Sequence, residues 1–166
     1  MRIDDIRLLF DYGYWATGRI LNTAAAVNLE QYTAPGGASH GSLRDTLTHT
    51  LAAEMTWRRR CQEGISPAVL PTGADFPTLA TLQQTWQEEE TAMAGYLATL
   101  DDADLDATIH YKTTKGAALQ NPLWHILTHV VNHGTQHRSE AAMMLSALGH
   151  SPGDLDLILF LRQRST

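Results

Sequence analysis

The chain has 166 residues, of which 43% are hydrophobic, and a formal net charge of −6. This length and composition suit one compact domain with a substantial core, and we expect a single domain over residues 1–166. The basic residues form no extended stripe for phosphate-backbone binding, so the composition argues against a nucleic-acid partner. The longest apolar run, near residues 155–161, is far shorter than the roughly 20 residues that span a bilayer.

The N-terminal residues lack the apolar stretch and cleavage site of a secretory signal. The single cysteine, Cys61, cannot form an internal disulfide and fits a reducing compartment. We therefore expect a cytoplasmic protein that acts on a small molecule and does not associate with membranes.

Apolar residues recur at three- and four-residue spacing from about residue 3 to residue 27, which predicts an amphipathic helix. Leu8, Tyr12 and Trp15 lie on a second face of this helix. Two apolar faces on one helix favour burial on both sides, and we expect one of them to pack against a partner subunit in a homodimer.

The proline and glycine content of residues 33–41 predicts a loop. Ser42 and Asp45 resemble a capping box that begins a second helix, which we expect to reach Gly64. Three prolines and a glycine in residues 65–78 indicate a long crossover connection. A third helix follows, with this apolar stripe: Leu79, Leu82, Trp86, Met93, Leu97 and Leu100.

Threonine, isoleucine and tyrosine around a Lys-Gly turn in residues 106–122 predict a small hairpin or an irregular excursion. Asn121 and Pro122 then begin a fourth long helix, with proline at its first helical position, and Gly149 ends it. The segment SPGDLDLILFLRQR predicts a short C-terminal helix that docks on the others. The chain is therefore predicted to be all-α, a four-helix bundle with a long crossover.

The fourth helix carries a histidine at every fourth position: His125, His129, His133 and His137. Each step of four residues advances about 40° around the helix, so the outer two histidines cannot share one ion and at most one adjacent pair binds directly. We favour His133 and His137, because Asn132 and Arg138 flank this pair. His129 is expected at the edge of the pocket, where it contacts substrate or orients a ligand.

His49 lies on the second helix with Ala52 and Ala53 on its face, so this side of the helix has room for a site. A third imidazole added to the pair would leave coordination positions open, as in reactive rather than structural metal sites. The alternative is that His49 is a hydrogen-bonded core residue and that the histidines of the fourth helix form a solvated stripe.

Three segments, LRDTLTHTLAAEMTW, HILTHVVNHGTQHRSEAAMMLSALG and DLDLILFL, resemble the DinB/YfiT-like family of metal-binding four-helix bundles. The resemblance covers nearly the whole chain. It implies one divalent ion held by His49, His133 and His137, a bundle with a long crossover, and a dimer. One departure is that the family's His-Arg-Gly-Gln is replaced here by His137, Arg138, Ser139 and Glu140.

The resemblance also implies a function, because the family includes transferases and isomerases that use low-molecular-weight thiols. The leading hypothesis is a metal-dependent thiol S-transferase, in which the ion activates a thiol for attack on a small electrophile and Arg138 or a neighbouring group holds an anionic part of a substrate. Zinc and nickel are the favoured ions, while iron, copper and manganese stay open.

Two alternatives remain at this stage. One is a metal-dependent hydrolase that uses a metal-bound water, with Glu54 or Glu140 as the general base. The other is a non-catalytic, stress-associated metal-binding or interaction protein. A di-iron centre is disfavoured because paired Glu-x-x-His motifs are absent from the sequence, and Cys61 is expected to be a packing or surface residue rather than a nucleophile.

Overall fold

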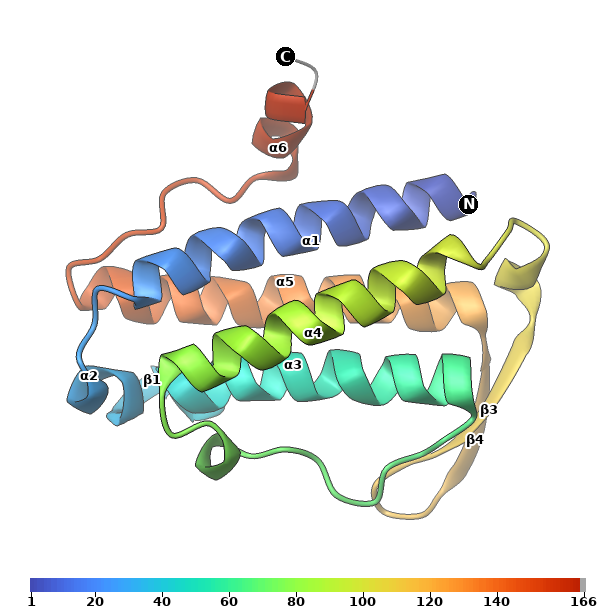
Figure 1. The fold of residues 1–166 in the computed structure, drawn as a ribbon, viewed down its shortest axis with the longest axis horizontal. Coiled ribbons are helices and arrows are strands. Elements are labelled where there is room, and N and C mark those ends of the chain that lie inside the picture. Colours follow the sequence, from blue (N-terminus) through green and yellow to red (C-terminus); the bar gives the residue numbers. More distant parts are fainter. Residues whose placement is uncertain (165–166) are drawn as a thin grey trace.

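The computed structural model describes residues 1–164 (Figure 1). Four long helices lie side by side: α1 (Ile3–Ala24), α3 (Leu43–Arg58), α4 (Leu79–Ala98) and α5 (Leu123–Ala147). Helix α5 packs against α1 and α3, and α4 packs against the same two helices. The predicted mostly helical fold is therefore confirmed. Among the described residues, no helix has both the length and the apolar character needed to cross a membrane.

The connection between α3 and α4 is the long crossover that the sequence predicts. Helices α3 and α4 run in the same direction, so the chain after Gly64 travels back along the length of the molecule (Figure 1). A π-helical turn, Arg59–Glu63, continues α3 to the predicted end at Gly64, which has a φ of +68°, and the crossover that follows includes a short 3₁₀ turn, Gly73–Asp75. Glycine adopts this left-handed backbone without a steric penalty.

The start of α3 is fixed by Ser42, as its sequence predicts. Ser42 Oγ accepts a hydrogen bond from the Asp45 backbone N–H at 3.0 Å, which satisfies one of the free donors at the helix start. The Asp45 carboxylate accepts from the same hydroxyl at 2.6 Å. The predicted capping box is therefore only half formed, because in a complete one this carboxylate accepts from the backbone N–H of the capping residue, Ser42.

Residues 1–164 include two small antiparallel hairpins. The predicted one pairs β3 (Thr108–Lys112) with β4 (Ala118–Pro122) in continuous register. Pro122 is the capping residue that precedes α5 rather than its first helical residue, because it still pairs with Thr108 in the hairpin. Gly149, with a φ of +84°, follows the end of α5 as predicted.

The second hairpin replaces part of the loop that the sequence predicts before α3. A short helix, α2 (Leu29–Thr33), leads into β1 (Pro35–Ala38) and β2 (Gly41–Ser42). The sequence PGGA has little intrinsic strand preference, so no alternating pattern announces these strands. The hairpin lies against α5, where a Cβ atom added to Gly36 would be 2.7 Å from Met144 Sδ.

Buried apolar side chains from the four long helices form the core. The stripe predicted on α4 is largely confirmed, since Leu82, Trp86, Met93 and Leu97 are buried. Glu89 is buried in the same row, and Arg58 compensates its charge with a two-pronged ion pair at 2.7 and 2.8 Å. A buried carboxylate requires such a partner.

Helix α6 (Leu157–Arg164) packs on α1, as predicted for the C-terminal segment. The Phe160 ring lies 6.0 Å from that of Tyr12 and 5.7 Å from that of Trp15, measured between centroids. The Tyr12 hydroxyl also donates to the Leu155 carbonyl at 2.9 Å. The chain's own C-terminal segment therefore covers part of the α1 face that we expected to meet a partner subunit.

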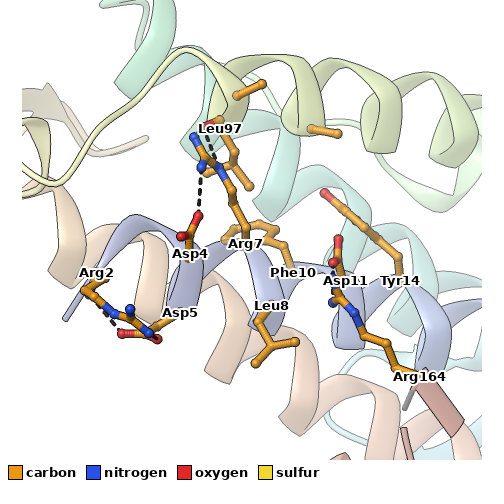
Figure 2. Close-up of a pocket in the computed structure, with 12 residues that line it drawn as sticks. Arg2, Asp4, Asp5, Arg7, Leu8, Phe10, Asp11, Tyr14, Leu97 and Arg164 are labelled. Carbon is orange, nitrogen blue, oxygen red and sulfur yellow. Dashed lines mark hydrogen bonds and ion pairs between the residues drawn. The ribbon is translucent and has the colours of Figure 1, made fainter. Parts of the chain in front are cut away.

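Arg7 ties α1 to the end of α4 in a hollow of about 490 Å³ (Figure 2). Its Nη2 donates to the carbonyls of Leu97 and Leu100, each at 2.9 Å, and its Nη1 pairs with Asp4 at 2.9 Å. The last carbonyls of a helix lack partners within the helix, so these bonds satisfy acceptors at the end of α4. Figure 2 also shows Arg2 paired with Asp5.

We predict that Arg7→Met lowers the free energy of unfolding by about 1–2 kcal/mol, because charge-assisted bonds between two helices are lost. Chemical denaturation measured by circular dichroism provides the test. Arg2→Met is the matched control and should cause no measurable change, because Arg2 is exposed and pairs only with Asp5 of α1. Equal effects of the two substitutions would contradict the role given to Arg7.

Candidate metal centre

Four histidine rings from three elements converge beside α3 and α5. His49 lies on α3, His133 and His137 lie on α5, and His40 lies in the turn between β1 and β2. The α5 pair shares one side of its helix because four residues make slightly more than one turn. Packing of α3 against α5 then places His49 opposite that pair.

The three histidines that the sequence singles out lie in mutual proximity. The Nε2 atoms of His49 and His133 are 3.0 Å apart. The His137 ring centroid lies 4.4 Å from that of His133 and 4.8 Å from that of His49. Residues separated by 84 positions in the chain thus meet at one point.

His40 is the member of this cluster that the sequence analysis missed. Its ring stacks on that of His49 with 3.7 Å between centroids, and it lies 4.9 Å from the His137 ring. Ligand nitrogens of His40, His49 and His137 all lie within 4.8 Å of one another, so these three residues could hold a metal ion. The only signal for His40 was a histidine in a glycine-rich segment close before the helix that carries His49.

The spacing of the nitrogens fits a shared ion. With Zn–N bonds of about 2.0–2.1 Å, two nitrogens on one ion lie about 2.9 Å apart at a right angle and about 3.4 Å apart at the tetrahedral angle. The His49–His133 distance of 3.0 Å falls within this range. Imidazole ligands suit zinc, nickel, copper and iron.

The protonation state of the rings also fits metal binding, which needs neutral imidazole. Burial, reinforced by the neighbouring His40 and His137, lowers the pKa of His49 to about 4. Burial and the adjacent His137 and His49 lower the pKa of His133 to about 4. At neutral pH both rings are therefore uncharged, as metal binding requires, and in the 3.0 Å contact the N–H of one ring donates to the lone pair of the other.

Glu140 fixes the orientation of His137. Its Oε2 lies 3.0 Å from His137 Nδ1, and the Ser39 hydroxyl donates to the same carboxylate at 2.9 Å. Burial opposes ionisation of Glu140, but the hydrogen bonds from His137 and Ser39 outweigh it and lower the pKa of the carboxyl. Nδ1 is thereby engaged and Nε2 is left for a ligand role. The carboxylate of Glu140 thus lies directly on a candidate ligand.

The three residues predicted to surround the ligands, His129, Asn132 and Arg138, lie in different environments. His129 is exposed, with its ring centroid 5.6 Å from that of His133, and Asn132 is exposed on α5. Arg138 is buried at 7% exposure and contacts α1, where its guanidinium lies 5.7 Å from the Tyr12 ring. A Cβ atom on Gly134 would come within 2.7 Å of Arg138 Nη1, so the glycine makes room for this side chain.

The two carboxylates considered as general bases both have partners. Glu140 is bonded to His137 and Ser39, and Glu54 accepts a hydrogen bond from the Tyr14 hydroxyl of α1 at 2.7 Å. Burial raises the pKa of Glu54 to about 7. Neither contact favours the hydrolase alternative, because a general base must reach the proton that it removes.

Cys61 lies in the π-helical turn after α3 and has little nucleophilic character. Burial raises the pKa of its thiol to about 12, so the thiolate is scarce at neutral pH. This agrees with the expectation that Cys61 is a packing residue.

Comparison with known proteins gives two findings. The sequence pattern of the DinB family matches residues 3–165. Protein DinB of Bacillus subtilis (strain 168) is 26% identical over 171 aligned residues, which cover 92% of this chain and 92% of that protein. The range matched by the family pattern includes all four clustered histidines and Glu140.

We predict that the Glu54 carboxyl titrates with a midpoint near pH 7 when followed by carbon NMR of labelled glutamate. Tyr14→Phe should raise the midpoint further, because the Tyr14 hydrogen bond favours the charged form. The ordinary pKa of a glutamate carboxyl is 4.5. Because folding favours the protonated form of Glu54, its contribution to the free energy of unfolding is full below about pH 4.5 and is lost as the pH rises through about 7. Tyr111→Phe, on the hairpin, is the control. A midpoint below 5 in the unmodified protein would contradict the assignment.

Proposed function

The chain belongs to the DinB family, and on this premise we propose that it binds one divalent metal ion and uses it to transfer a low-molecular-weight thiol to a small electrophile. The observation that carries the proposal is the convergence of histidines from three separate elements on one point. Uncharged imidazoles on a partly exposed surface favour a metal that is open to small molecules over one enclosed for structural purposes.

We propose His49, His133 and His137 as the ligands. His49 and His137 also belong to the group of three that includes His40, so these two are common to both ligand sets. The short Nε2–Nε2 distance between His49 and His133 supports the inclusion of His133. His40 is then a fourth imidazole, stacked on His49, that can complete the set or restrict access to it.

A divalent ion in this donor set would retain its full charge and lower the pKa of a nearby thiol, whose proton would pass to solvent. The thiolate sulfur would then form a bond to the electrophilic carbon as the electrophile's leaving group departs with its electron pair. The chain's own residues perform the positioning. Glu140 and Ser39 hold His137 in one orientation, and the carboxylate increases the basicity of the ring. His40, His49 and His133 are only half-buried, which leaves an approach for both substrates. Zinc and nickel are the ions we propose, and both accept imidazole ligands.

The arrangement of the four long helices as a four-helix bundle of DinB type, and a homodimer, are part of the same proposal. The closed sequence of neighbours α1, α5, α3 and α4 supports the bundle. The half-buried Tyr12 and Trp15 of α1, which α6 covers only in part, support a second contact surface on that helix.

We expect the purified protein to bind zinc or nickel at one ion per chain, and His49→Ala and His137→Ala to lower the affinity at least tenfold, since each removes a ligand. Metal analysis after dialysis, combined with circular dichroism to confirm folding, provides the measurement. His110→Ala is the control, because this exposed histidine lies on β3. Unchanged metal content in His49→Ala would overturn the proposed site.

The same measurement on His40→Ala and His133→Ala identifies the third ligand. We expect the larger loss of affinity in His133→Ala. A larger loss in His40→Ala would assign the set to His40, His49 and His137 instead.

The activity is tested by conjugation of bacillithiol, mycothiol or glutathione to the fluorogenic electrophile monochlorobimane. We expect turnover with metal-loaded protein, loss of turnover after chelation, and about a tenfold reduction in Glu140→Gln, because a weaker partner then orients His137. Parallel assays of ester and amide hydrolysis distinguish the alternatives. Hydrolysis without conjugation would favour a hydrolase, and activity in neither assay would favour a non-catalytic protein.

A further inference from the structure

A pocket of about 290 Å³ lies beside the histidine cluster, at the end of the molecule where the β3–β4 hairpin meets α5. Residues from α3, both strands of the hairpin and α5 line it: Trp57, Tyr111, Asn121, His125, Ile126 and His129. None of these side chains is a carboxylate, a lysine or an arginine. The lining thus combines aromatic rings with imidazole and amide groups.

His129, which lines the pocket, is also a neighbour of His133 in the candidate metal centre. The His129 ring lies 5.5 Å from that of Trp57 and 5.6 Å from that of His133. His129 and His133 are one turn apart on α5, which is about 6 Å along the helix axis. A small molecule can therefore have one end near the histidine cluster and the other against the rings of Trp57 and His129.

The π-helical turn after α3 supports the walls of the pocket. It places the Arg60 guanidinium 4.5 Å from the Trp57 ring and 5.2 Å from the Tyr111 ring, and Arg60 Nη2 donates to the Lys112 carbonyl at 2.9 Å. Such stacking of a cation on aromatic rings is favourable, and π-helical turns occur frequently at functional sites. Arg60 thus joins α3 to the hairpin behind the pocket.

Further contacts fix the two aromatic side chains. The Trp57 and Tyr111 rings meet nearly at right angles, at 75° with 4.9 Å between centroids. The Tyr111 hydroxyl donates to Asn121 Oδ1 at 2.8 Å. A site whose side chains are already held by such contacts binds a ligand with less loss of conformational entropy.

We infer that this pocket binds a planar aromatic or conjugated group of the electrophilic substrate and presents its reactive atom to the thiol at the histidine cluster. The inference rests on the proposed function and names the substrate class. Rings with exposed faces and edges bind flat apolar groups by offset stacking and edge-to-face contact. The absence of charged side chains among the six lining residues favours an uncharged ring in this position.

The test uses cobalt(II)-loaded protein and two thiols, ethanethiol and 2-phenylethanethiol. The second probe joins both substrate parts in one molecule, a sulfur for the metal and a ring for the pocket, and thiolate binding is followed in the cobalt absorption spectrum. We expect 2-phenylethanethiol to bind about tenfold more tightly than ethanethiol, because the ring is removed from water.

Two variants and two matched controls localise this preference. Trp57→Leu and Tyr111→Ala should reduce the ratio of the two affinities, 2-phenylethanethiol over ethanethiol, from about tenfold to about twofold or less. The affinity for ethanethiol itself should not change. Trp15→Leu, under α6, and His110→Ala, next to Tyr111 on the exposed hairpin, should retain the preference. Tyr111 lies outside the helical core, so Tyr111→Ala tests the pocket even where Trp57→Leu impairs folding.

The outcomes separate the two proposals. An equal preference in all variants would overturn the pocket assignment and leave the metal-dependent function intact. Failure of cobalt to bind, or of either thiol to alter its spectrum, would overturn the proposed function and this inference with it.

Discussion

The packing of α3 against α5 is the contact on which the rest of the molecule's candidate chemistry depends. It brings His49 to within 3.0 Å of His133, and the same pair of helices supplies Trp57, His125 and His129 to the neighbouring pocket. The long crossover after α3 makes this geometry possible. It lets α4 run in the same direction as α3 and pack on α1 and α3, so that α5 returns in the opposite direction and packs against α3 (Figure 1). Fold and site are thus two aspects of one helix–helix interface.

Around this interface, three carboxylates have hydrogen-bonding partners. Arg58 compensates Glu89, Tyr14 donates to Glu54, and Glu140 engages His137. Each pairing limits the side chain to one orientation, which is valuable beside a site that requires fixed ligand directions. The negative charge of Glu140 also distinguishes this centre from one with a neutral amide at the same place, since it strengthens electron donation by the ring.

The sequence was most informative where helical periodicity controls position. The four-residue spacing of His133 and His137, the start of α3 at Ser42 and the crossover after Gly64 follow from local rules, and the structure agrees. His40 could not be placed in this way, because its position depends on a hairpin of glycine-rich strands that pack on α5. The aromatic pocket was also missed, since it needs a π-helical turn and a strand contact that no periodic pattern encodes.

The separation of the histidines along the chain has a consequence for biosynthesis. During translation, His40 and His49 are synthesised long before His133 and His137. The rings of His40 and His49 therefore cannot meet those of His133 and His137 until α5 has been made. If the proposed centre binds an ion, the nascent chain offers it only half of the cluster, so complete coordination would have to follow the docking of the last long helix.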